Sequence, residues 1–306
     1  MHNLSLRQLE AVREVGRCGT LIKAAKVLCV TPAALTSRVK LLEDELGLQL
    51  FEHFEGRFRL TEAGKEVIAA AARIDNVISD LLGTLQGTNG MLGGRIRIGV
   101  VSTAKYFAPR LIAAFMKQHP EVDLRLWIHN RRDIVSMLCD YEIDIALMGG
   151  PPQDFSVKSE PIGPHPHVII APPDHPLTRE ARISKTELAS QNFIVREDGS
   201  GTRSMFDNFF SGLAMRSYKV RMEIGSNETI KQAVMAGLGI SLISAHTIQA
   251  EITSGRLVIL KMEGLPIMRK WFAIQRADRM LSPAGRAMWT FMVNNGADFL
   301  PQVEVG

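Results

Sequence analysis

The spacing of apolar residues along this chain changes character once, near residue 90. Before that point it predicts helices over residues 6–16, 21–28, 32–46 and 62–87. Beyond it, short apolar runs typical of strands alternate with helical patterns. The change coincides with "GTNGMLGG", residues 87–94, where four glycines in eight residues predict a hinge and a domain boundary.

The helix starts carry capping signals. Ser5 followed by Gln8 predicts a capping box for the first helix, which we expect Gly16 to close. Thr20 is placed to cap the second helix. Thr31 is placed to cap the third, with Pro32 at its first position, where a missing N–H costs nothing. Because Pro32 also disfavours helical geometry at the residue before it, the second and third helices stay separate, about three residues apart, as in a helix-turn-helix.

The third helix has two different faces. Leu35, Val39, Leu42 and Leu46 form one buried stripe. The other side carries small residues, hydroxyls and cations, which suit close approach to a DNA groove, although a solvated amphipathic helix would look similar. The candidate DNA-binding residues here are Thr31, Pro32, Ala33, Thr36, Ser37, Arg38 and Lys40.

A short hairpin is predicted after the third helix. The runs "LQLFEHF" and "RFRLT" flank a turn at Glu55–Gly56. This hairpin would form a wing, with Arg57 and Arg59 placed to contact a phosphate or the minor groove. Residues 1–41 hold seven lysines and arginines against two glutamates, which fits a nucleic-acid contact confined to one small element.

The fourth predicted helix carries apolar residues at alternating steps of four and three. This pattern is typical of a helix that pairs with another helix, so we expect a dimerisation helix; the alternative is a helix packed on the core of its own domain. We call this set the apolar seam: Val67, Ala71, Ile74, Ile78, Leu81 and Leu85.

From residue 94 the order strand, helix, strand, helix, strand predicts a largely parallel sheet with right-handed crossovers. A second set follows, and the last strand and helix are expected to return to the first lobe. Ligands of such sheets bind at the carboxyl ends of strands. Two strand ends carry hydroxyls or glycines at the start of a helix. Free N–H groups at such a start favour binding of an anion, and Arg203 would add a cation at one of them. The alternative for this motif is an ordinary loop with a helix cap. The candidate effector-binding residues are Ser102, Thr103, Ala104, Gly199, Ser200, Gly201, Thr202, Arg203, Asn227 and Glu228.

Composition excludes several classes of protein. The 306 residues suit two or three domains, and 46% hydrophobic with 22% charged residues is normal for a globular protein. The sequence shows no signal peptide and no apolar run long enough for a membrane span. Three unpaired cysteines fit a reducing cytoplasm. His165 and His167 lack a third ligand, so we expect a crossover between lobes there and no metal site.

An enzyme acting on a phosphorylated metabolite is the main alternative. "DGSGTR" matches neither a P-loop nor a nucleophile elbow, and "GLGISL" lacks the third glycine of a dinucleotide fingerprint. We therefore expect no catalytic residues, cofactor or metal. A free periplasmic binding protein would need a signal sequence and would not need the first 90 residues.

The motifs "AAKVL", "LTSRVKLLEDELGLQLF" and "RLTEAG" resemble the LysR-type transcriptional regulators over the whole chain. Many members carry Gln at the position of Pro32, so the base contacts here must come from its neighbours. "VTPAALTSRVKLLEDELGL" and "GSGTR" are further similar to the subgroup that controls Calvin-cycle (RuBisCO) operons.

The resemblance implies an α+β and α/β architecture: a winged helix-turn-helix (1–60), a linker helix and hinge (61–90) and a two-lobed periplasmic-binding-protein-like sensor (91–306). Lobe I would comprise about 91–165 and 268–306, and lobe II about 166–267. It also implies a cytoplasmic activator, dimeric or tetrameric, with promoter DNA and RNA polymerase as partners. The effector would be a small anionic metabolite, either a phosphorylated sugar or NADPH.

Overall fold

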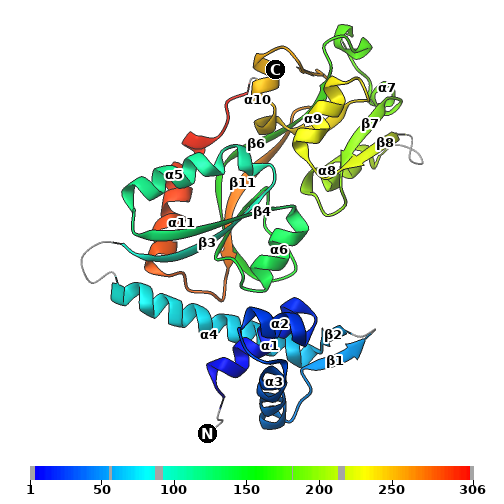
Figure 1. The fold of residues 1–306 in the computed structure, drawn as a ribbon. Coiled ribbons are helices and arrows are strands. Elements are labelled where there is room, and N and C mark those ends of the chain that lie inside the picture. Colours follow the sequence, from blue (N-terminus) through cyan, green and yellow to red (C-terminus); the bar gives the residue numbers. More distant parts are fainter. Residues whose placement is uncertain (1–3, 55–56, 87–91, 181, 213–217, 304–306) are drawn as a thin grey trace. The chain divides into compact units, whose positions relative to one another are not determined.

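The computed structural model describes residues 4–54, 57–86, 92–180, 182–212 and 218–303, and at 53, 54, 57, 76, 79, 80 and 82–86 it describes the backbone alone. Residues 1–82 and most of 83–306 form two compact units, here called the N-terminal and C-terminal units (Figure 1). No described helix is both long and apolar enough to cross a membrane.

The N-terminal unit has the predicted helix-turn-helix and hairpin. Its core is formed by the buried stripe of the third helix, including Leu35 and Leu42, packed against the first helix and the hairpin. The Thr31 side chain caps this helix by accepting a hydrogen bond from the Ala34 N–H at 3.2 Å. The elements are α1 (Leu6–Cys18), α2 (Leu21–Val27), α3 (Pro32–Leu46), β1 (Phe51–Phe54), β2 (Arg57–Leu60) and α4 (Glu62–Gln86).

Two details at the first helices differ from expectation. The capping box at Ser5 is present, but α1 continues past Gly16 and ends at Gly19, which has φ +66°. Gly16 packs against α4, and a Cβ there would lie 2.8 Å from Ile68 Cδ1, so the end of that side chain would have to shift. Thr20 occupies the N-cap of α2, yet its side chain makes no capping hydrogen bond.

The apolar seam of α4 divides into two parts. Val67 and Ala71 pack on the core of the N-terminal unit, which is the alternative considered for the whole helix. Further along, Ile74 is 38% exposed and Leu81 57% exposed. The side chain of Leu85 lies outside the described residues. Only the distal part of the seam therefore presents apolar surface.

The C-terminal unit is built on a mixed sheet in the order β10-β6-β11-β5-β3-β4, with β9 also paired to β6. The pairs β3–β4 and β3–β5 are parallel, as predicted, and β11 is antiparallel to both neighbours. Helices α5 and α11 lie on one face and α6 on the other (Figure 1). The bounds are β3 (Gly94–Val101), α5 (Ala108–Gln118), β4 (Val122–His129), α6 (Arg131–Cys139), β5 (Ile145–Met148), β6 (Val157–Ala171), β9 (Ser241–Ser244), β10 (Val258–Ile259), β11 (Ile267–Arg276) and α11 (Pro283–Asn295).

Two lobes can be distinguished by their cores. Lobe I surrounds β3, β4 and β5 with α5, α6 and α11. Lobe II is built around β9 and a two-stranded parallel sheet with its helices. The long strands β6 and β11 run through both lobes. The remaining elements are 3₁₀ helix η2 (Ala104–Tyr106), α7 (Lys185–Ala189), β7 (Asn192–Arg196), α8 (Gly201–Phe210), β8 (Lys219–Ile224), α9 (Asn227–Met235) and α10 (Gln249–Thr253), with short 3₁₀ turns at 176–179, 245–247 and 296–299.

Candidate functional site

The candidate DNA-binding surface lies on the solvent side of α3. Ala33, Ser37 and Lys40 are exposed, and Arg38 is half-buried. Thr36 donates its hydroxyl to the Pro32 carbonyl at 2.9 Å, and Thr31 uses its hydroxyl for the cap. In this geometry Ser37, Arg38 and Lys40 are the polar side chains available to reach DNA.

The two strands of the predicted hairpin pair antiparallel, with Phe51 opposite Leu60. Arg59 is exposed and lies 3.9 Å from a carboxylate oxygen of Glu52, a contact weak enough to yield to a phosphate. The Glu55–Gly56 turn and the Arg57 side chain lie outside the described residues.

The second candidate site is a cavity of about 610 Å³ between the two lobes of the C-terminal unit. Its walls come from the carboxyl ends of β3 and β5, the start of α6, the crossing strands and the start of α8, which is where open α/β sheets bind ligands. Its lining, among the described residues, contains three arginines (Arg131, Arg196 and Arg269) and no aspartate or glutamate.

The start of α8 contributes the feature expected for an anion site. Ser200, Gly201 and Thr202 line the cavity, facing Ser102 and Thr103 of lobe I. Ser200 occupies the N-cap, but its side chain makes no capping hydrogen bond. The first N–H groups of α8 therefore lack a side-chain cap, and the positive end of the helix dipole meets the cavity.

Arg131 is the cation best placed to meet a ligand. Its guanidinium donates to the carbonyl oxygens of Gly150 (2.6 Å) and Pro151 (3.0 Å), which fix it without neutralising its charge. Burial lowers the pKa of Arg131, and nearby Arg269 lowers it further. Both causes penalise the charged form, so an anion between these arginines would be stabilised by them.

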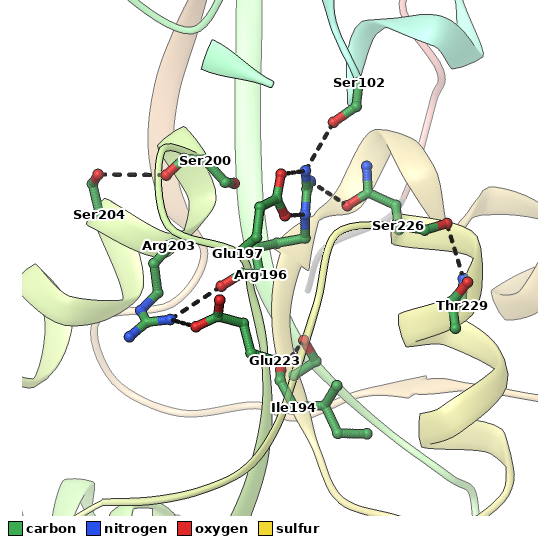
Figure 2. A network of polar contacts seen from close by, with 12 residues as sticks. Ser102, Ile194, Arg196, Glu197, Ser200, Arg203, Ser204, Glu223, Ser226 and Thr229 are labelled. Atoms are coloured by element: carbon green, nitrogen blue, oxygen red, sulfur yellow. Dashed lines mark hydrogen bonds and ion pairs between the residues drawn. The ribbon is translucent and has the colours of Figure 1, made fainter. Parts of the chain in front are cut away.

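Arg196 links the lobes through its guanidinium (Figure 2). It is buried, pairs with Glu197 at 2.7 Å, and donates to Ser102 of lobe I (3.1 Å) and Asn227 of lobe II (2.7 Å). Next to it, the Arg132 N–H donates to the Gly199 carbonyl at 3.1 Å, and Arg132 also pairs with Asp198. Contacts between the lobes thus surround the cavity.

Arg203 lies apart from this cavity. Figure 2 shows its guanidinium beside Glu223, at 2.7 Å, and it also pairs with Asp207, so two carboxylates already hold it. Arg203 is not part of the cavity lining. The Arg203 side chain points away from the start of α8. This direction could not be predicted from the sequence motif.

Four other candidates also lie outside the lining: Ala104, Gly199, Asn227 and Glu228. Gly199 has φ +85° and a Cβ there would meet Arg132 at 3.1 Å, so this glycine permits the lobes to approach. Asn227 accepts from Arg196, and Glu228 accepts the Tyr106 hydroxyl proton of lobe I. Glu228 thus joins the lobes, Asn227 holds Arg196 within lobe II, and neither residue lines the space.

Sequence analysis missed the histidines of the cavity. His165 and His167 lie in β6, as expected for a crossover, but both also line the cavity. Burial lowers the pKa of His165 well below its usual range and that of His167 to about 3, so both rings are neutral at pH 7. No cluster of three or more metal-ligating side chains occurs in the described part of the chain.

Two family models match this chain. The family described as "Bacterial regulatory helix-turn-helix protein, lysR family" matches residues 6–65, and "LysR substrate binding domain" matches residues 89–297. The transcriptional regulator CbbR of Xanthobacter flavus is 44% identical over 99% of this chain and 91% of its own length. The RuBisCO operon transcriptional regulator of Allochromatium vinosum is 42% identical over 97% and 98%.

A solved structure is also similar. The regulatory domain of CcmR from Synechocystis PCC6803, in complex with 2-PG, has a TM-score of 0.61 and 36% identity, covering 65% of this chain and 95% of that domain. The predicted architecture and the preference for a regulator over an enzyme are confirmed by these matches. The chain belongs to the LysR family of transcriptional regulators.

Proposed function

We propose that this chain regulates a RuBisCO operon by binding promoter DNA through α3 and the wing and by responding to a small anionic metabolite in the interlobe cavity. The observation that carries the effector assignment is the cavity itself, lined by Arg131, Arg269 and the Glu197-paired Arg196, an uncapped helix start and no carboxylate in the described lining. The operon assignment rests on the similarity to CbbR and to the Allochromatium vinosum regulator.

The effector site in this proposal retains Ser102, Thr103, Ser200, Gly201 and Thr202. It replaces Arg203 with the three lining arginines. A ligand that draws on Arg196 competes with its bonds to Ser102 and Asn227, which belong to different lobes. Effector binding would then favour one arrangement of the lobes over another, as a response to a ligand requires.

We expect Arg131→Met to weaken binding of 2-PG about 10- to 100-fold, because a charge-assisted hydrogen bond contributes about 1.5–3 kcal/mol. Arg203→Met is the matched control, since Arg203 follows the cavity-lining residues Ser200 to Thr202 in sequence but lies outside the cavity and pairs with Glu223. Isothermal titration calorimetry of the full chain would measure both. Unchanged affinity in Arg131→Met would contradict the effector site and leave the DNA assignment standing.

We expect Arg38→Ala and Lys40→Ala each to weaken promoter binding and to lower the slope of log affinity against log salt by about one, because each phosphate contact releases counterions. Fluorescence anisotropy at several salt concentrations would measure the slope. Lys117→Ala, on the exposed side of α5, is the control and should leave it unchanged. An unaltered slope in both α3 variants would remove that helix surface from the DNA interface.

The distal part of the apolar seam supports a homodimer within this proposal. Ile74 and Leu81 of the seam are 38% and 57% exposed, and neighbouring Val77, outside the seam, is 68% exposed, so a second copy of this helix would bury them. The proposal also includes pairing of dimers into a tetramer and a contact with RNA polymerase during activation. It places the protein in the cytoplasm, where promoter DNA lies. The domain boundaries near residues 60 and 90 belong to it as well.

A further inference from the structure

Lobe I contains a second cavity, of about 320 Å³, that shares no lining residue with the interlobe cavity. It lies at the beginning of β6 and the end of β11, under α11 and the loop that leads into that helix. Its lining, in the described part of the chain, is Lys158, Gln275, Arg279, Met280, Leu281, Arg286, Trp289 and Thr290.

The floor of this cavity holds a buried amide without a complete set of partners. Gln275, on β11, is 8% exposed, and its Oε1 has no hydrogen-bond partner among the described residues. Lys158 of β6 stands directly opposite Gln275 in the ladder, so both side chains project from the same face of the sheet. A buried acceptor without a donor is unfavourable, and it calls for a donor from the cavity.

The walls carry positive charge. Lys158 and Arg286 have no carboxylate partner in the described chain, and Arg286 donates only to the Leu281 carbonyl at 2.6 Å. Arg279 is different, because it pairs with buried Asp144, which also binds Arg97. Two cations without a carboxylate partner among the described residues thus line the same cavity as the unpartnered amide oxygen, and no aspartate or glutamate occurs in the described lining.

The third component is apolar. Trp289 and Leu281 contribute the hydrophobic part of the lining, next to Gln275 and Arg286. An inorganic anion would satisfy the cations and leave the amide oxygen and the indole unused. A neutral apolar molecule would leave the cations unused. The volume is at the lower end of the range for ligand sites, so the ligand must be small.

From this combination we infer that the lobe I cavity is a second binding site, for a small organic acid whose anion meets Lys158 and Arg286, whose hydroxyl or amine donates to Gln275 Oε1, and whose apolar body packs on Trp289. The site is independent of the interlobe cavity, and the inference holds whether or not the proposed effector is correct. A single ordered water on Gln275 is the alternative occupant.

The chain supplies its own reporters. It contains three tryptophans: Trp289 lines the second cavity, Trp271 stacks on His165 of the first at 3.7 Å, and Trp127 lines neither. In full-length protein labelled with 5-fluorotryptophan, titration with 4-hydroxybenzoate should shift the Trp289 ¹⁹F resonance saturably and leave the Trp271 resonance in place. Trp289→Phe and Trp271→Phe assign the resonances.

Variants and related probes separate the contributions. Gln275→Leu, which keeps the volume, should weaken binding about three- to tenfold, and benzoate, which lacks the hydroxyl, should bind to the unaltered protein about as weakly. Lys158→Met should weaken binding about tenfold or more, whereas Lys117→Met should not. Three results would each overturn the inference. The first is equal binding of 4-hydroxybenzyl alcohol, and the second is a saturable shift at Trp271 alone. The third is no shift at Trp289 up to about 10 mM, which would leave water as the occupant.

Discussion

Lys231→Met is expected to lower the free energy of unfolding of the C-terminal unit by about 3–5 kcal/mol, because it leaves the buried Glu251 carboxylate without its cation. Lys231, on α9, is 3% exposed. Its Nζ lies 3.0 Å from Glu228 and 3.0 Å from Glu251 and donates to the Thr247 carbonyl at 2.9 Å. Methionine keeps the apolar length of the side chain, so the variant removes the charge and little else.

Urea unfolding followed by circular dichroism would measure this loss. Lys117→Met, at an exposed position, should change stability by less than about 0.5 kcal/mol. Adding Glu251→Gln to Lys231→Met should recover part of the loss, since Glu251 is the more buried of the two carboxylates. Two results would contradict a stabilising role for the ion pairs of Lys231. One is a Lys231→Met variant as stable as the unaltered chain, and the other is a double variant less stable than the single one.

Acid should destabilise the C-terminal unit well above the range in which carboxylates titrate. Burial lowers the pKa of His167 to about 3 and that of His246 to about 4, and it lowers the pKa of His165 as well. In the unfolded chain these rings take up protons near pH 6.5. Below that pH the unfolded state therefore binds more protons than the folded state, so stability falls as pH falls.

Between pH 6.5 and 5 we expect a loss of about 1 kcal/mol per pH unit for each of these three histidines. Urea titrations at pH 7, 6 and 5 would give the slope. His167→Gln should reduce it by about one third, while His129→Gln, at an exposed position, should leave it unchanged. A pH-independent midpoint over this range would mean that the rings are protonated, or open to solvent, in the folded protein.

The N-terminal unit was largely predictable because its signals are local. The cap at Thr31 and the buried stripe on α3 depend on residues within a few positions of one another. Gly16 was misassigned as a helix end, since its packing against Ile68 involves a segment about fifty residues away. The apolar seam was regular in sequence, yet its first part packs on its own unit and only its distal part is exposed.

The interlobe cavity was harder to predict, because its lining residues come from distant parts of the chain. Hydroxyls and glycines after β3 and β7 marked the correct strand ends, because position along a parallel sheet follows from chain order. The arginines did not follow this rule. Arg131 begins α6 and Arg269 lies on β11, far apart in sequence, and Arg203 faces two carboxylates that only the folded chain brings near it.

Sequence analysis placed only a crossover between lobes at His165 and His167, whereas β6 begins at Val157 and contains Pro161, Pro164 and Pro166, which are unusual within a strand. They are tolerated because this part of β6 pairs with β11 on one side only, whereas β9 and β10 pair with residues 167–171. His165 and His167 were consequently assigned to a connection. Their contribution to the cavity lining could not be predicted from their spacing.

The position of β11 also bears on how this protein emerges from the ribosome. β11 lies between β5 and β6 in the sheet, although it is the last strand to be synthesised. Until residue 276 has left the exit tunnel, β5 exposes a hydrophobic edge next to β3, while the β7–β8 segment and its helices can already condense. A truncated transcript that ends before this strand would therefore release an open sheet edge, the kind of surface that chaperones bind and that otherwise aggregates.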